Sequence, residues 1–151
     1  MKIRKATVAD LGAMQQLYCD TIRTVNAHDY TPEQIETWVS GVSGIPARFG
    51  EQECFVAEID EQLVGFSSLY PNGYLDFMYV HKDFQGRGIA KALLKTVEEL
   101  ARELSISEVT SDVSITARPF FTRHGYAVIR EYTKVFKNQE FRNTWMKKKI
   151  L

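Results

Sequence analysis

The segment from residue 74 to residue 104 constrains this chain most, because a strand pattern gives way there to a helix pattern. Residues 74–80 are rich in aromatic and β-branched side chains, which are typical of a buried strand. From Ile89 onward the apolar residues recur every three or four positions, which predicts a long amphipathic helix. Gly86 and Gly88 lie between the two patterns. The segment therefore predicts a strand, a glycine turn and a helix.

The turn before this helix has the properties of an anion-binding site. The first amide groups of a helix have no partner inside it, and the macrodipole adds partial positive charge there. Glycine has no Cβ, so Gly86 and Gly88 let an anion approach those amides closely. The spacing is neither that of the P-loop nor G-x-G-x-x-G. We therefore expect a phosphate or diphosphate to bind here, although a plain strand-to-helix connection could carry the same glycines.

Shorter strand and helix patterns surround this unit. Helices are expected over residues 11–22, from Pro32 to Gly41, and over 117–124. Segment 41–50 carries three glycines and a proline, so we expect a loop with at most one helical turn. The further strands are expected over residues 2–6, 54–59, 63–70, 108–112, 126–136 and 141–146. No repeat or linker interrupts this order, which predicts a single domain over residues 1–151.

Bulk composition narrows the classes of function. The chain has 151 residues, 44% of them hydrophobic and 25% charged, which is typical of a soluble globular domain. The 19 basic residues balance the 19 acidic ones, which argues against a nucleic-acid partner. No membrane-spanning segment or signal-peptide pattern is found, so we expect a cytoplasmic protein without a membrane partner. Cys19 and Cys54 are isolated, and no metal site is expected.

The motif Q-x-x-G-x-A at residues 85–90 resembles the acyl-CoA-binding signature [QR]-x-x-G-x-[GA] of the GCN5-related N-acetyltransferase (GNAT) superfamily. The wider run V-H-K-D-F-Q-G-R-G-I-A-K-A-L-L is similar to the most recognisable segment of that family. Residues 114–126 resemble a second family segment, N-x-x-A-x-x-[FL]-[YF]-x-x-x-G-[FY]. The runs A-R-P-F-F and F-R-N-T-W-M-K-K also resemble a branch of small, mostly uncharacterised bacterial acetyltransferases.

This resemblance covers essentially the whole chain and implies its fold. The expected class is α/β (α+β), with a mixed, mostly antiparallel sheet of about seven strands and helices on both faces. The expected order of elements is β-α-α-β-β-β-α-β-α-β-β. The implied activity is direct transfer of an acetyl group from acetyl-CoA, as cosubstrate, to a primary amine of a small molecule or peptide. The alternative is a non-catalytic acyl-CoA-binding or interaction module on the same fold. The exposed final hairpin could also support a homodimer.

The resemblance also implies where acyl-CoA binds. The cleft is expected beside the strand that precedes the signature, with the backbone of residues 78–80 pairing with the pantetheine arm. The amides of residues 85–90 are expected to hold the pyrophosphate. Ser114 stands where the family often has an asparagine that contacts pantetheine. In full, the cofactor-binding residues implied are Met78, Tyr79, Val80, Gln85, Gly86, Arg87, Gly88, Ile89, Ala90, Ser114 and Phe121.

The catalytic groups are less clear, because Phe121 occupies the position of the usual general-acid tyrosine and has no proton to donate. An amine must lose a proton before it attacks, so a base is needed. Asp76 is the first candidate, since alternation along the strand places it on the same face as Met78, and Asp112 is the second. Tyr132 is the candidate acid. Tyr30 and Trp38 are expected at the entrance for the acceptor.

Overall fold

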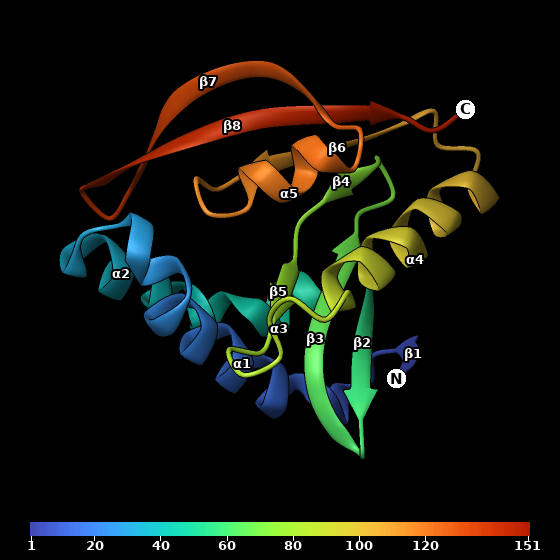
Figure 1. Cartoon of the computed structure of the whole chain (residues 1–151), viewed down its shortest axis with the longest axis horizontal. Helices are drawn as coiled ribbons and strands as arrows, with labels where there is room; N and C mark the ends of the chain where they lie inside the picture. Colours follow the sequence, from blue (N-terminus) through green and yellow to red (C-terminus); the bar gives the residue numbers. More distant parts are fainter.

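The expected central strand is broken in two, and this break organises the fold. In the computed structural model, which describes residues 1–151, β4 (Tyr74–Leu75) ends before Asp76, and β5 (Met78–Val80) begins after Phe77. β4 pairs in parallel with β6 (Glu108–Val113), whereas β5 pairs antiparallel with β3 (Gln62–Leu69). The two halves therefore belong to different sheets, which diverge at the break (Figure 1).

A side chain from the neighbouring strand holds this break in place. The buried Ser68 of β3 accepts a hydrogen bond at its hydroxyl from the Phe77 amide (2.8 Å). Its own amide donates to the Phe77 carbonyl (3.1 Å). A hydroxyl thus replaces a ladder carbonyl, and both polar groups of Phe77 are satisfied although the regular strand is interrupted.

The two sheets have four strands each, in the orders β1-β2-β3-β5 and β4-β6-β8-β7. Every strand pair is antiparallel except β4 with β6. The remaining strands are β1 (Lys2–Lys5), β2 (Glu53–Ile59), β7 (Ala127–Phe136) and β8 (Gln139–Lys149). The prediction of a mixed, mostly antiparallel α/β fold is confirmed, with the strands divided between two sheets rather than joined in one.

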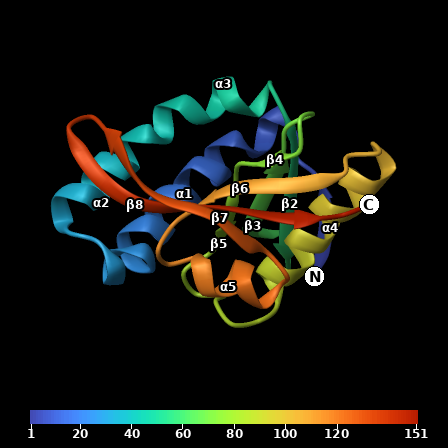
Figure 2. The same ribbon diagram turned by 90° about the horizontal axis from the view of Figure 1, so that it is seen from above.

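Helices cover both faces of the first sheet, as expected. The helices are α1 (Leu11–Thr24), α2 (Pro32–Val39), α3 (Ile45–Phe49), α4 (Ile89–Glu103) and α5 (Arg118–Arg123). Helices α1 to α3 lie on one face, where Phe66 and Phe77 pack among their apolar residues. α4 lies on the other face, where Leu93 packs against Val64. Figure 2 shows this separation from above, with α5 on the same side as α4.

Segment 41–50 is more helical than its composition indicates. A 3-10 helix spans Ser40–Gly44 and leads directly into α3. Pro46 occupies the first turn of α3, where its missing amide hydrogen would have no partner in any case. The expectation of a loop with at most one helical turn is therefore wrong. The correction matters, because α3 carries Arg48, which reaches the break between β4 and β5.

Candidate active site

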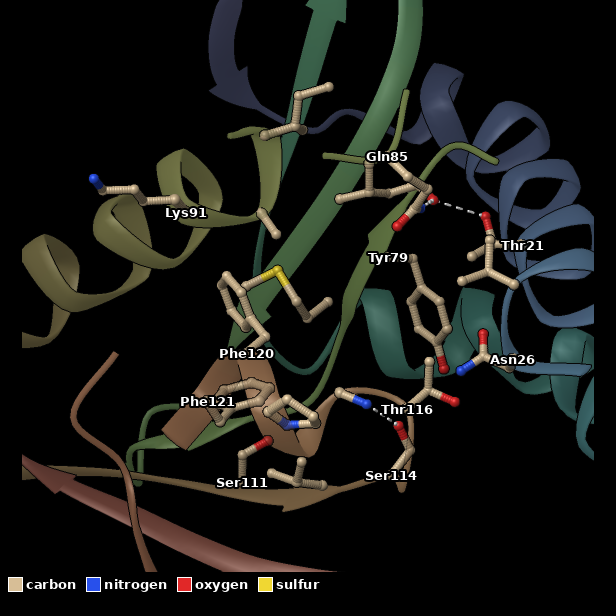
Figure 3. A pocket seen from close by; sticks show the side chains of 18 of the residues that line it. Thr21, Asn26, Tyr79, Gln85, Lys91, Ser111, Ser114, Thr116, Phe120 and Phe121 are labelled. Atoms are coloured by element: carbon tan, nitrogen blue, oxygen red, sulfur yellow. Dashed lines mark hydrogen bonds between the residues drawn. The ribbon is translucent and has the colours of Figure 1, made fainter. Parts of the chain in front are cut away.

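A cleft of about 550 Å³ opens where the two sheets diverge. It extends from the turn before α4, past β5, to β6 and α5 (Figure 3). Of the eleven cofactor-binding residues expected from the sequence, all except Arg87 line this cleft. The members of the expected set that line this inter-sheet cleft are Met78, Tyr79, Val80, Gln85, Gly86, Gly88, Ile89, Ala90, Ser114 and Phe121.

The turn before α4 has its amide groups free. No amide of residues 85–91 donates a hydrogen bond to a protein group, and the first that does is Ala92, to the Gly88 carbonyl (3.1 Å). Gly86 and Gly88 have φ of 74° and 77°, in the left-handed region that glycine tolerates best. A Cβ built at either position would meet no atom within 4 Å. The corner is therefore open, and seven successive amides are available to an anion.

Side chains hold this turn against the end of β5. The Gln85 amide group donates to the Val80 carbonyl (2.7 Å), and the Thr21 hydroxyl of α1 donates to the same oxygen (3.0 Å). The Gln85 side chain is thus engaged with the protein and positions the turn, leaving its backbone amide free. Arg87 does not line the inter-sheet cleft, because its guanidinium lies over the Phe84 ring, 4.9 Å from the centroid.

The edge of β5 that faces the inter-sheet cleft has no neighbouring strand. The bonds from Ser68 N to Phe77 O and from His81 N to Val64 O show that odd-numbered residues direct their backbone groups toward β3. By the alternation of an antiparallel strand, Met78 and Val80 direct theirs away, into the cleft. The Met78 amide has no hydrogen-bond partner outside the regular ladders. A bound extended molecule could therefore pair with β5 as a neighbouring strand would.

The far wall of the cleft is apolar around α5. Phe121 is 2% exposed and lies edge-on against Phe120 and Tyr126, at ring-centroid distances of 5.5 and 5.1 Å. The Ser114 hydroxyl accepts a hydrogen bond from the Ala117 amide (3.1 Å), which fixes the turn before α5. This wall offers no titratable group at the position of Phe121.

A second cavity of about 210 Å³ adjoins the first on the side of α1, α2 and α3. Half of its lining side chains are aromatic, and we call it the aromatic cavity. The aromatic members are Tyr18, Tyr30, Trp38, Tyr74, Tyr79, Phe136 and Phe141. Five residues line both this cavity and the inter-sheet cleft, namely Trp38, Asp76, Tyr79, Asp112 and Ser114. These five residues form a junction at which two molecules, one in each space, could meet.

Asp76 lies at the junction but is fully engaged. Arg48 of α3 donates to both of its oxygens (3.0 and 2.6 Å), and Gln52 donates a third bond (2.9 Å). Burial lowers the pKa of Arg48 and its bonds to Asp76 raise it by more, so the guanidinium stays charged. The expectation that Asp76 shares a face with Met78 is wrong. Met78 packs toward the α4 side, whereas the strand break turns Asp76 toward α3.

Asp112, near the end of β6, is as buried as Asp76 but accepts hydrogen bonds from neutral groups only. Tyr132 donates to one oxygen (2.7 Å) and Asn143 to the other (3.1 Å). The Lys134 ammonium lies 3.6 Å away, beyond a good hydrogen bond, with half of its side chain exposed. Burial and the adjacent Asp112 raise the pKa of Tyr132. Tyr132 lines neither the cleft nor the aromatic cavity, and its hydroxyl reaches the junction through its hydrogen bond to Asp112.

Tyr79 occupies the junction instead. Its ring packs 5.0 Å from that of Tyr18, and Figure 3 shows its hydroxyl pointing into the cleft. Burial raises the pKa of Tyr79 well above the ordinary value, so the phenol is protonated at neutral pH. The hydroxyl donates no hydrogen bond within the protein, in contrast to that of Tyr132. The sequence placed Tyr79 in the cofactor site by position, and nothing in it indicated a free phenol.

The two residues expected at the acceptor entrance lie in the aromatic cavity. Tyr30 and Trp38 pack edge to face at 5.3 Å, and the Tyr30 hydroxyl accepts from the Ile115 amide (2.9 Å). Sequence analysis missed Arg48, Lys134 and Asn143, which come from α3 and the final hairpin. In the sequence, each of the three is a polar residue with no motif around it. Only the packing of its helix or strand against the junction shows that it belongs to the site.

No cluster of three or more histidine, cysteine, aspartate or glutamate side chains has an arrangement that could hold a metal ion. None of the helices has the length and hydrophobicity that crossing a bilayer requires.

Comparison with known proteins is consistent with this geometry. The domain described as Acetyltransferase (GNAT) domain matches residues 26–150. The uncharacterized N-acetyltransferase YafP of Escherichia coli (strain K12) is 34% identical over 142 residues, covering 91% of this chain and 91% of the relative. The crystal structure of a GCN5-related N-acetyltransferase from Rhodopseudomonas palustris is 29% identical, with a TM-score of 0.94 over 98% of this chain and 94% of the other.

A more distant structure shares the fold. It is the PaiA N-acetyltransferase from Thermoplasma acidophilum in complex with coenzyme A, with 20% identity and a TM-score of 0.75 over 98% of both chains. The domain match spans most of the chain and includes β5, the open corner and α4. The chain therefore belongs to the GNAT acetyltransferase family.

Proposed function

We propose that this protein is an N-acetyltransferase that moves an acetyl group from acetyl-CoA directly to a primary amine in a ternary complex. The observation that carries the proposal is the junction, where five residues line both the inter-sheet cleft and the aromatic cavity. Acetyl-CoA supplies the activated acetyl group as a thioester and is assigned to the cleft. The amine is assigned to the aromatic cavity. Two spaces that meet at one point favour direct transfer over a covalent enzyme intermediate.

In this proposal the backbone binds the donor. The free amides of residues 85–91 hold the diphosphate, assisted by the positive end of the α4 macrodipole. The backbone of Met78, on the edge of β5 that has no neighbouring strand, pairs with the amides of the pantetheine arm. The relative from Thermoplasma acidophilum was crystallised with coenzyme A, which supports a ligand of this kind on this fold. Ser114 and Phe121 close the opposite wall of the cleft.

The junction supplies the catalytic groups. We assign the oxyanion site to the Met78 amide, which is unpaired and faces the cleft. We assign proton acceptance to Asp112, because three hydrogen bonds from Arg48 and Gln52 already occupy Asp76. Tyr132 and Asn143 then serve to orient the Asp112 carboxylate.

The role of acid, expected from the sequence at Tyr132, we assign to Tyr79, which lines both the cleft and the aromatic cavity and donates to no protein acceptor. A thiol of pKa about 8.5 leaves with little help, so the demand on this acid is modest.

Binding and turnover test the proposal separately. Calorimetric titration with acetyl-CoA should give a dissociation constant below millimolar, and a panel of primary amines should release free thiol in the presence of the enzyme. Absence of binding at millimolar acetyl-CoA would remove the proposal.

Phe121 keeps one alternative open, a non-catalytic acyl-CoA-binding module, because the usual acid is missing there. That alternative predicts binding of acetyl-CoA with no thiol release from any amine.

A further inference from the structure

The aromatic cavity admits only a small acceptor. Its volume of about 210 Å³ corresponds to roughly seven water molecules at about 30 Å³ each, below the range of typical drug-sized pockets. Half of its lining residues are aromatic, so flat rings form much of its wall. The same walls also carry charged groups and tyrosine hydroxyls, so they fit a small molecule with an aromatic or apolar side chain and polar ends.

The aromatic cavity also contains two ion pairs of different character. Arg48 and Asp76 are bonded through two guanidinium nitrogens and both carboxylate oxygens, and the Asp76 side chain is 9% exposed. Lys134 and Asp112 approach only to 3.6 Å, and the Lys134 side chain is 50% exposed. The ion pair of Arg48 and Asp76 is therefore tightly bonded. The second can be opened, because Asp112 keeps its bonds from Tyr132 and Asn143 when Lys134 moves away.

The net charge of the aromatic cavity indicates what kind of molecule can separate Lys134 from Asp112. The four charged side chains of the aromatic cavity, Arg48, Lys134, Asp76 and Asp112, sum to zero. A cationic amine alone would leave a net positive charge among aromatic side chains, where screening is weak. A molecule with one ammonium and one carboxylate keeps the sum at zero.

We propose that the acceptor is a small zwitterionic amine of the amino-acid type, with an apolar or aromatic side chain. This inference rests on the proposed function. The substrate ammonium replaces Lys134 beside Asp112, and the freed Lys134 ammonium binds the substrate carboxylate. Lys134 is thereby a specificity-determining residue, and the aromatic walls receive the apolar side chain.

The transfer step balances with the groups at hand. The ammonium gives one proton to Asp112, and the nitrogen lone pair attacks the thioester carbon. The N–C bond forms, the C–S bond breaks, and coenzyme A leaves as a thiolate. The thiolate takes up the second proton that the acylated nitrogen loses, and Asp112 releases the first proton to solvent. The product is an N-acetyl acid that has lost its positive charge. Asp112 then regains Lys134 as its partner, which favours release of the product.

Matched pairs of acceptors test the inference, each pair differing only in the carboxylate. The pairs are phenylalanine and phenylethylamine, tryptophan and tryptamine, and leucine and 3-methylbutylamine. Thiol release gives kcat/KM for each. We expect the amino acid to exceed its decarboxylated partner by about tenfold to a hundredfold in at least one pair, as for one charged hydrogen bond. Lys134→Gln should lower that ratio to near one by raising KM for the amino acid.

Lys147 offers a matched control. It lies on the same hairpin with 51% exposure and a single carboxylate at 4.0 Å, outside both cavities. Lys147→Gln should leave the ratio unchanged. A ratio near one in every pair, or a ratio insensitive to Lys134→Gln, would overturn the inference while the proposed function stands on any amine that is acetylated. Failure of the wild type to bind acetyl-CoA would overturn both.

Discussion

The inter-sheet cleft and the aromatic cavity share five residues, yet they are built from different parts of the chain. The cleft presents backbone, namely the free amides of residues 85–91 and the unpaired edge of β5. The aromatic cavity presents side chains from both ends of the chain, including Tyr18 of α1 and Phe141 of β8. A backbone site keeps its chemistry when side chains change, provided that the conformation holds. A side-chain site changes its ligand with each substitution, so the two spaces should respond to opposite kinds of variant.

The largest effect is expected at the junction itself. Asp112→Asn should lower kcat by about 10²–10⁴-fold, the usual contribution of a general base, with acetyl-CoA affinity unchanged. The loss should shrink as pH rises toward the pKa of the acceptor, about 8 to 10, because the free amine then needs no base. Steady-state kinetics across pH, with calorimetry for acetyl-CoA, measures both.

Asp76→Asn is the comparison for this variant. It leaves the Arg48 guanidinium without its carboxylate partner, so we expect lower stability with a smaller change in kcat. If Asp76→Asn instead gives the larger loss, with recovery at high pH, then Asp76 is the base as the sequence first indicated.

The same contrast explains what the sequence could predict. The open corner follows from a contiguous motif, since Gly86, Gly88 and the first turn of α4 are neighbours in the chain. The strand break could not be predicted, because the pattern of residues 74–80 is continuous and the cause is Ser68 on another strand. The aromatic cavity draws on α1, α2, α3 and the final hairpin. No pattern within one of these segments predicts which of their side chains line the same cavity.

Replacing a glycine tests the backbone groups that the inter-sheet cleft presents to acetyl-CoA. Gly88→Ala should weaken acetyl-CoA binding by about tenfold or more, because an L-residue at a φ of 77° is strained by about 1–2 kcal/mol and its Cβ enters the anion corner. Gly12→Ala is the matched control, since its Cβ would also meet no atom within 4 Å, in α1 and outside both cavities. Calorimetry should show no change in affinity for the control. Equal losses in the two variants would remove the corner from the binding site.

Tyr79→Phe should have a smaller effect. It removes the free hydroxyl at the junction and keeps the ring that packs on Tyr18. We expect kcat to fall by about tenfold, at the low end for acid catalysis, because a thiolate is a good leaving group. Tyr132→Phe serves as the comparison and should act through Asp112, with a change in the pH profile of the base limb. An unchanged kcat in Tyr79→Phe would show that the thiolate leaves unassisted.

The smallest expected effect comes from two variants in and next to α2. They distinguish a loss of helix stability from a change in the shape of the aromatic cavity. Thr31 and Gln34 form the capping box of α2, with bonds of 3.2 and 2.8 Å. Gln34 also donates to the Glu140 carbonyl (2.6 Å), which ties α2 to the final hairpin. Trp38 of α2 and Phe141 of that hairpin are opposing walls of the cavity, with rings 6.3 Å apart.

Thr31→Ala and Gln34→Ala should therefore cost similar stability, about 1 kcal/mol each, measured by denaturant unfolding. Only Gln34→Ala should also raise KM for the acceptor, by a few-fold, because the two walls lose their common tie. The acetyl-CoA dissociation constant should stay constant in both variants, since the corner before α4 is on the opposite side of the junction. A rise in acceptor KM that simply tracks the stability loss in both variants would mean that the aromatic cavity depends on α2 as a whole. The hairpin contact would then have no separate role in setting its shape.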